Sequence, residues 1–123
     1  MDVTPLVKAG SQIIQSYAGG VFKISGVTHE EAVVVTASVT LPWSPPKNLS
    51  DLTIQHFESL PEGIDVILLG TGAQMQFLPP AVKMALKEAG LPAIDVMDTG
   101  AACRTYNVLL AEGRRVAACL MPV

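Results

Sequence analysis

The stretch DVILLGTGAQ, residues 65–74, joins a continuous apolar run of strand length to a turn with two glycines. Successive side chains of a strand point to opposite faces, so such a run is typical of a strand covered on both sides. Similar apolar runs recur at AIDVM (93–97) and RVAACLM (115–121). The stretch therefore predicts a buried central sheet with packed layers on both faces.

The segments between these runs have the boundary residues of helices. Pro79 and Pro80 suit a first helical turn, where a missing N–H does no harm, and Gly90 ends that helix. Asp98 or Thr99 caps a second helix, which runs to about Ala111 and ends before Gly113. We expect the first helix to bury an apolar face made of Val82, Ala85, Leu86 and Ala89.

The resulting order, strand–helix–strand–helix–strand, predicts a mixed central sheet with at least one parallel pair and right-handed crossovers. The short connection at Gly113 favours an antiparallel last strand. Upstream, SQIIQSY (11–17) and VFKIS (21–25) flank a glycine turn and predict an antiparallel hairpin beside that sheet. We expect residues 1–123 to form one three-layer α/β domain, in which prolines 42, 45 and 46 interrupt regular structure.

Composition excludes several classes of function. Half of the residues are hydrophobic, 15% are charged, and the net charge is −3 without any run of basic residues. Nucleic-acid binding needs clustered positive charge, so we expect none. No apolar stretch approaches the roughly 20 residues that span a bilayer. The start MDVTPLVKAG lacks the apolar core of a secretion signal, so we expect a soluble, cytoplasmic protein.

The two cysteines, Cys103 and Cys119, are sixteen positions apart and form no C-x-x-C pair. Neither His29 nor His56 has a metal-like spacing to them, so we expect no metal site and no cofactor. A disulfide is compatible with the separation, but free thiols are favoured in an intracellular chain.

The turn Gly70-Thr71-Gly72 follows the carboxyl end of an apolar strand, where α/β sheets collect ligands. It could therefore cradle a small anion or a nucleotide. It lacks the lysine of a phosphate loop, and Met75 stands where a dinucleotide fingerprint has its third glycine. The interpretation as a tight turn that needs a positive φ is favoured.

The second helix holds the remaining reactive side chains. Cys103 shares a face with Tyr106 and Leu110, which favours a core thiol over a nucleophile. Arg104 either pairs with Asp95, Asp98 or the carbonyls of the glycine turn, or binds an anionic ligand or a partner's carboxylate. Asn107 is a poor helix former, which indicates that its amide bonds a specific group.

Trp43 lies beside three prolines in the loop LPWSPPKNLS (41–50). A large aromatic side chain in such a loop is either an exposed anchor for a protein partner or a plug at the sheet edge.

The segments SYAGGVFKISG, DVILLGTGAQ and VMDTGAACRTYNVLLAEGRRVAACL, together with a proline-opened helix, resemble a family of small domains of unknown function. This family includes mitochondrial NADH dehydrogenase (complex I) assembly factor 3 and uncharacterised bacterial and archaeal proteins. The resemblance implies a three-layer α/β fold with a mixed sheet and a flanking hairpin, roles in assembling membrane complexes, and no established catalytic residues. Because no mitochondrial targeting segment precedes Met1, we expect a prokaryotic member.

Two hypotheses for function follow. The first is a non-catalytic interaction or assembly-factor-like module with a protein partner, and it leaves a homo-oligomer open. The second is a protein or enzyme that binds a small anion or nucleotide. Its site would lie where the strand ends at Leu69 and Met97 meet, and would use the following residues: Gly70, Thr71, Gly72, Asp98, Thr99, Arg104 and Asn107.

Overall fold

A computed structural model of the chain describes residues 9–123. Its strands are β1 (Ile14–Ala18), β2 (Val21–Ile24), β3 (Val27–His29), β4 (Val33–Val35), β5 (Thr40–Pro42), β6 (Val66–Gly70), β7 (Ala93–Met97) and β8 (Val116–Leu120). Its helices are the 3-10 turns η1 (Leu49–Asp51) and η2 (Ile54–Phe57) and the α-helices α1 (Pro80–Glu88) and α2 (Thr99–Ala111). The short turn η2 begins directly after Thr53.

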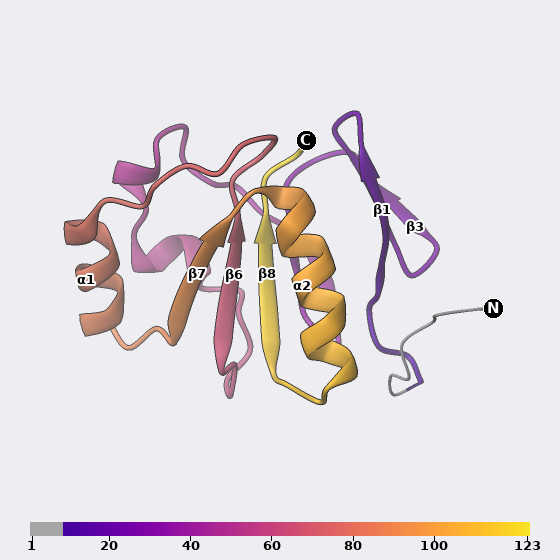
Figure 1. The fold of residues 1–123 in the computed structure, drawn as a ribbon. Helices are drawn as coiled ribbons and strands as arrows, with labels where there is room; N and C mark the ends of the chain where they lie inside the picture. The colour runs from indigo at the N-terminus through magenta and orange to yellow at the C-terminus, as the bar shows by residue number, and fades with distance from the viewer. Residues whose placement is uncertain (1–8) are drawn as a thin grey trace.

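The strands form two sheets (Figure 1). The larger sheet has the order β5-β4-β8-β6-β7; β6 runs parallel to β7 and β8, and β4 runs antiparallel to β8 and β5. The smaller sheet, β1-β2-β3, is antiparallel. The predicted mixed central sheet and flanking hairpin are confirmed, and β3 extends the hairpin by one strand.

The direction of the last strand differs from the sequence prediction. β8 is parallel to β6, with Val66 opposite Val116 and Gly70 opposite Leu120. The short connection after α2 does not force an antiparallel neighbour, because α2 itself carries the chain back along the sheet before β8 begins. β7, α2 and β8 therefore form a crossover that passes over β6.

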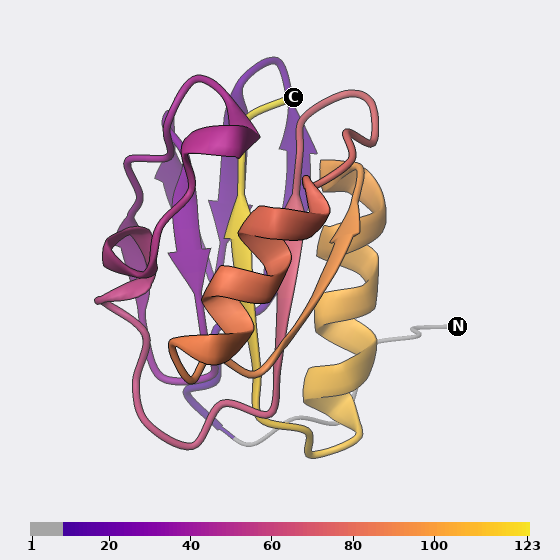
Figure 2. The same ribbon diagram turned by 90° about the vertical axis from the view of Figure 1, so that its left-hand side faces the viewer.

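Successive side chains of the central strands point to opposite faces of the large sheet. They divide the core into two halves, one on each face, and helices and the small sheet cover these faces (Figure 2). Val66 and Leu68 face α2 and the small sheet, whereas Ile67 and Leu69 face α1 and the 3-10 turns. These layers confirm the three-layer architecture. No helix among residues 9–123 is long and apolar enough to cross a membrane.

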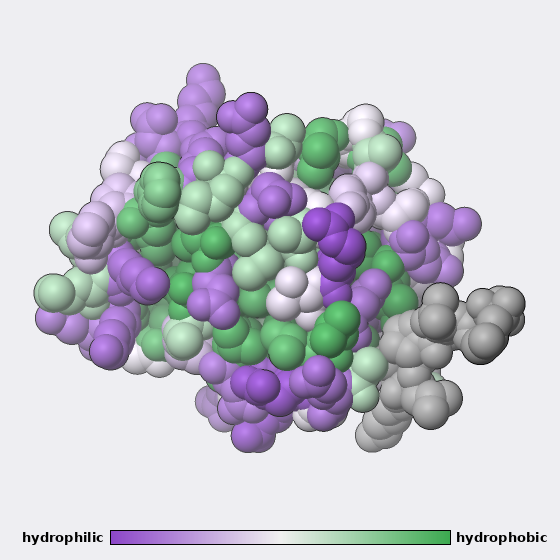
Figure 3. All heavy atoms as spheres, in the orientation of Figure 1, coloured by the Kyte–Doolittle hydropathy of each residue, from purple (hydrophilic) through white to green (hydrophobic). Residues whose placement is uncertain are grey.

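The two α-helices differ in how deeply they pack. α2 buries six residues, whereas α1 buries only Leu86, with Val82 half-buried. The prediction that α1 buries a full apolar face is therefore wrong, because Ala85 and Ala89 are exposed. Hydrophobic side chains remain visible at the surface around α1 and β7 (Figure 3).

Candidate functional site

The carboxyl ends of β6 and β7 lie side by side, as the proposed ligand site requires. Gly70 pairs with Met97 in the parallel register, and the N–H of Thr71 donates to the carbonyl of Met97 over 3.0 Å. The glycine turn and the start of α2 therefore meet at one rim of the sheet (Figure 1). What this rim can bind depends on which of its polar groups are left unpaired.

Thr99 occupies the centre of the rim and is fully buried. Its hydroxyl accepts a hydrogen bond from the N–H of Gly72 (2.8 Å) and donates to the carbonyl of Met121 (2.7 Å). Its own N–H donates to the carbonyl of Gly72 (2.9 Å). Thr99 thus fastens the glycine turn to the end of the chain after β8, and the N–H of Gly72 is already used.

The glycine turn is also bonded within itself. The hydroxyl of Thr71 donates to the carbonyl of Gln74 (2.8 Å) and accepts from the N–H of Gln76 (3.0 Å). Gly72 has a φ of +98°, as expected for a tight turn. Gly70 is needed for a different reason, because Thr99 packs closely against its Cα. A Cβ on Gly70 would lie 3.0 Å from the Cα and Oγ1 of Thr99. The turn is therefore packed against the start of α2, and the N–H groups of Thr71 and Gly72 already have partners within the chain.

Asp98 is the N-cap of α2, and Oδ1 of its carboxylate accepts the N–H of Ala101 over 2.9 Å. This geometry is that of an ordinary capping residue, which satisfies one of the unpaired donors of the first turn.

Arg104 bonds to the small sheet and not to an acid. Its guanidinium donates to the hydroxyl of Tyr17 on β1. Within residues 9–123 no ion pair joins it to Asp95 or Asp98, so the predicted acid pairing is wrong. The ring of Tyr17 lies directly on Gly100, where a Cβ would approach its hydroxyl to 2.9 Å. Arg104, Tyr17 and Gly100 together form a contact that positions β1 on α2.

Asn107 makes a second attachment to β1. Its side-chain carbonyl accepts the N–H of Ile14 (3.1 Å) and its NH₂ donates to the carbonyl of Ile14 (2.8 Å). The prediction that this amide bonds a specific group is confirmed. Nearby, the hydroxyl of the fully buried Tyr106 donates to the carbonyl of Gln12 (2.8 Å). These bonds attach the small sheet along the length of α2.

Both cysteines are free thiols in the core. Burial raises the pKa of Cys103 to about 12; nearby Arg104 acts in the opposite direction and Asp98 raises the pKa further. Burial also raises the pKa of Cys119 to about 12. A thiol of this kind is protonated at neutral pH, and the thiolate is the nucleophile. Cys103 therefore has the environment of a packing residue.

Trp43 is 6% exposed, so its prediction as a surface anchor for a partner is wrong. Its ring packs on Phe57 with the ring centroids 6.1 Å apart, and its indole N–H donates to the carbonyl of His56 (2.7 Å). Folding η2 back over the proline-rich loop covers the indole, which sequence alone could not show. Of the two alternatives for Trp43, the structure favours the side chain that packs at the edge of the sheet.

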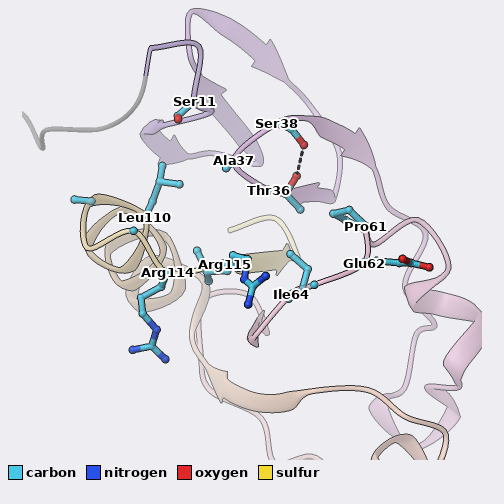
Figure 4. A pocket seen from close by; sticks show the side chains of 14 residues that line it. Ser11, Thr36, Ala37, Ser38, Pro61, Glu62, Ile64, Leu110, Arg114 and Arg115 are labelled. Carbon is cyan, nitrogen blue, oxygen red and sulfur yellow. Dashed lines mark hydrogen bonds between the residues drawn. The ribbon is translucent and has the colours of Figure 1, made fainter.

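A hollow of about 440 Å³ opens at the opposite end of the sheet, beside Val116 at the start of β8 (Figure 4). Ile64 and Leu110 contribute apolar walls, while the guanidinium of Arg114 points outward. The side chain of Arg115 pairs with Asp65 (Nε to Oδ2, 3.3 Å), and both side chains are exposed. Among residues 9–123 no buried side-chain polar atom lacks a partner, so nothing in this hollow indicates a ligand.

Comparison with known proteins identifies the family. Residues 14–121 match the family model described as Protein of unknown function (DUF498/DUF598). The chain belongs to this family. An uncharacterised Rhodobacter capsulatus protein is 36% identical over 94% of this chain and 88% of its own length. A Bordetella parapertussis crystal structure matches with a TM-score of 0.79 and 30% identity, covering 94% of this chain and 98% of that one.

The DUF498/DUF598 relatives also include a protein of named role. NADH dehydrogenase [ubiquinone] 1 alpha subcomplex assembly factor 3 of Danio rerio is 36% identical over 89% of this chain. The match covers 64% of that factor, so this chain spans less than two thirds of it. The family resemblance expected from the sequence is confirmed.

The exposed surface of this DUF498/DUF598 chain holds a group that the sequence reasoning missed. Phe77 is 84% exposed, Met84 is 62% exposed and Met75 is 44% exposed. Phe77 and Met75 precede α1 and Met84 lies on it. The available signal was three large apolar residues in MQFLPPAVKM (75–84), outside the face assigned to the core. Met75 and Phe77 line the same hollow beside β7, and adjacent exposed apolar side chains mark interaction surfaces.

Proposed function

We propose that this chain is a non-catalytic protein-binding module with an assembly-factor-like role, acting on respiratory complex I as the name of its relatives suggests. The observation that supports this most is how the polar residues of α2 are used. Thr99, Arg104 and Asn107 bond to other parts of the same chain, while the exposed side chains of Met75, Phe77 and Met84 are apolar. Exposed apolar and aromatic side chains are typical of surfaces that bind other proteins.

The relatives add a specific direction to this proposal. The zebrafish relative is named as an assembly factor of NADH dehydrogenase, and its similarity extends over 89% of this chain. Fold likeness alone does not carry function, so the assignment depends on a test in cells. We include the expected location, the cytoplasm of a prokaryote, in the same proposal.

A replacement experiment tests the proposed role. In human cells that lack assembly factor 3, the matching segment of the human protein is replaced by residues 14–121 of this chain. The remaining human segments are kept, because this chain covers 62% of the human protein. We expect the chimera to restore assembled NADH dehydrogenase on native gels, with the intact human factor as positive control.

The same experiment separates binding from chemistry. The Cys103→Ala chimera removes the one buried thiol of α2 and should restore assembly as well as the unsubstituted chimera. Loss of rescue by this variant, at equal protein level, would favour a reactive role for the thiol. A chimera that accumulates in mitochondria and restores no assembled enzyme overturns the assembly proposal.

A further inference from the structure

β7 is the outermost strand of the large sheet on the side of α1 (Figure 1). The carbonyl of Met97 accepts a bond from Thr71, on the side of β6. The N–H and C=O of one strand residue point to the same side, and those of the next residue point to the other. The peptide groups of Ile94 and Val96 therefore face the outer edge, where no strand of residues 9–123 pairs with them.

A groove runs along this outer edge between β7 and α1. It consists of two adjacent hollows of about 280 and 290 Å³, which share Lys83, Ile94 and Asp95. Met75 and Phe77 line one end of the groove, and the other end is lined by Leu91 and Pro92. The groove therefore accompanies β7 from its first residue to its fourth and has apolar walls at both ends.

The charges on the α1 side of the groove are positive. Lys83 and Lys87 are one helical turn apart and both line it. Neither forms an ion pair within the part of the chain that the structure describes. Ile94 and Val96 pack with Leu86 on the α1 face of the sheet, so Asp95, the alternate residue, points to the other face. An incoming strand would meet lysines on one face and an aspartate on the other.

A second copy of this chain fits the groove poorly. Two β7 strands can pair antiparallel about a two-fold axis that is perpendicular to the sheet. This arrangement keeps both α1 helices on the same face of the joined sheet. The lysines of the two helices would then face each other. The antiparallel register centred on residue 95 would also place two aspartates directly opposite, which destabilises a strand pair.

We propose that an extended segment of a different protein adds as a strand to the outer edge of β7. Its side chains on the α1 face are apolar and acidic, matching Phe77, Met75 and the two lysines, and a basic residue on its other face meets Asp95. Backbone pairing supplies affinity and the alternating side chains supply specificity. This inference rests on the proposed protein-binding function and names the surface that performs it.

Peptide selection tests the inference directly. Phage-displayed random 12-residue peptides are selected on the wild-type chain and counter-selected on the Val96→Pro variant. Proline at residue 96 removes an N–H that faces the outer edge and leaves the pairing of β7 with β6 intact. We expect enriched peptides with alternating apolar and acidic residues, and slower amide exchange of Ile94 and Val96 when a selected peptide is bound.

Surface variants test the same site without altering a strand. Lys83→Glu/Lys87→Glu and Phe77→Ser should each weaken the selected peptides at least tenfold. The matched controls are Lys23→Glu/Lys47→Glu and Val108→Ser, which are exposed residues elsewhere and should change affinity less than twofold. Absence of peptides that prefer wild type over Val96→Pro overturns the inference, as does unchanged affinity in the groove variants.

Three further outcomes are decisive. Sedimentation that shows a wild-type dimer and a Val96→Pro monomer would assign the edge to a second copy and overturn the inference. If the human chimera restores assembly equally with and without Lys83→Glu/Lys87→Glu and Phe77→Ser, the groove inference fails and the proposed function stands. If the groove binds selected peptides but no chimera restores assembly, the assembly role fails and the groove stands.

Discussion

Asn107 uses both ends of its amide to hold a single residue of β1. Replacing it with alanine leaves the N–H and the C=O of Ile14 without these partners. We expect Asn107→Ala to lower the free energy of unfolding by about 1–3 kcal/mol, the usual cost of unpairing buried polar groups. Urea unfolding measures this change.

The control for this variant is Asn48→Ala. Asn48 is exposed, and its side chain makes no capping bond to η1. Its replacement should change the free energy of unfolding by less than about 0.5 kcal/mol. Equal effects of the two substitutions would show that the bonds to Ile14 add nothing to stability.

The buried thiols predict how stability depends on pH. A cysteine ordinarily ionises near pH 9.0, whereas Cys103 and Cys119 in the folded chain have a pKa of about 12. Between these values the unfolded chain has released protons that the folded chain still holds, so stability declines as the pH rises above 9. Urea midpoints between pH 7 and pH 10.5 should fall less steeply for Cys103→Ala/Cys119→Ala than for wild type. Parallel curves would contradict the assigned pKa values.

At the scale of elements, the two helices should open with different free energies. α2 buries six residues and is bonded to β1, whereas Leu86 is the one buried residue of α1. Segments with few buried contacts exchange their amide protons through local opening. We therefore expect the amides of α1 to exchange faster than those of α2 in the native protein, as measured by NMR. Equal protection would mean that α1 opens only with the whole domain.

The elements also show what the sequence could predict. Asp98 and Gly113 mark the ends of α2 because capping and turn residues act locally. The apolar runs 66–70 and 116–120 also identify buried strands from local sequence. A strand that is buried on both faces needs continuous apolar residues. The direction of β8 depends on where α2 carries the chain, and no local pattern encodes that path. The apolar face predicted for α1 was too wide, because the sheet contacts only one turn of it.

The candidate site was harder to predict than the fold. Sequence places Gly70, Thr71, Gly72, Asp98 and Thr99 at one rim, and the structure brings these residues together. Whether the rim is open depends on the hydroxyl of Thr99, whose two bonds join segments distant in the sequence. Arg104 likewise depends on Tyr17, 87 positions away. Side chains look reactive in a sequence until their long-range partners are known.

For the whole molecule, the internal bonds of the glycine turn and the start of α2 predict that small anions do not bind there. A ligand that binds only the folded state raises the midpoint of thermal unfolding. Because Gly72, Thr99 and Arg104 are already bonded within the chain, inorganic phosphate, nucleotides and small carboxylates should leave the midpoint unchanged. A rise with one of these compounds that disappears in Arg104→Ala would revive the anion site. A rise that persists in this variant would place the ligand elsewhere.

The shallow packing of α1 on the sheet has a consequence for how such domains diversify. A helix that buries one leucine and half-buries one valine loses few core contacts when its exposed residues change. Substitutions on that helix can therefore accumulate while the heavily bonded opposite face stays constant. Related proteins could exchange one client for another by changing a single exposed helix.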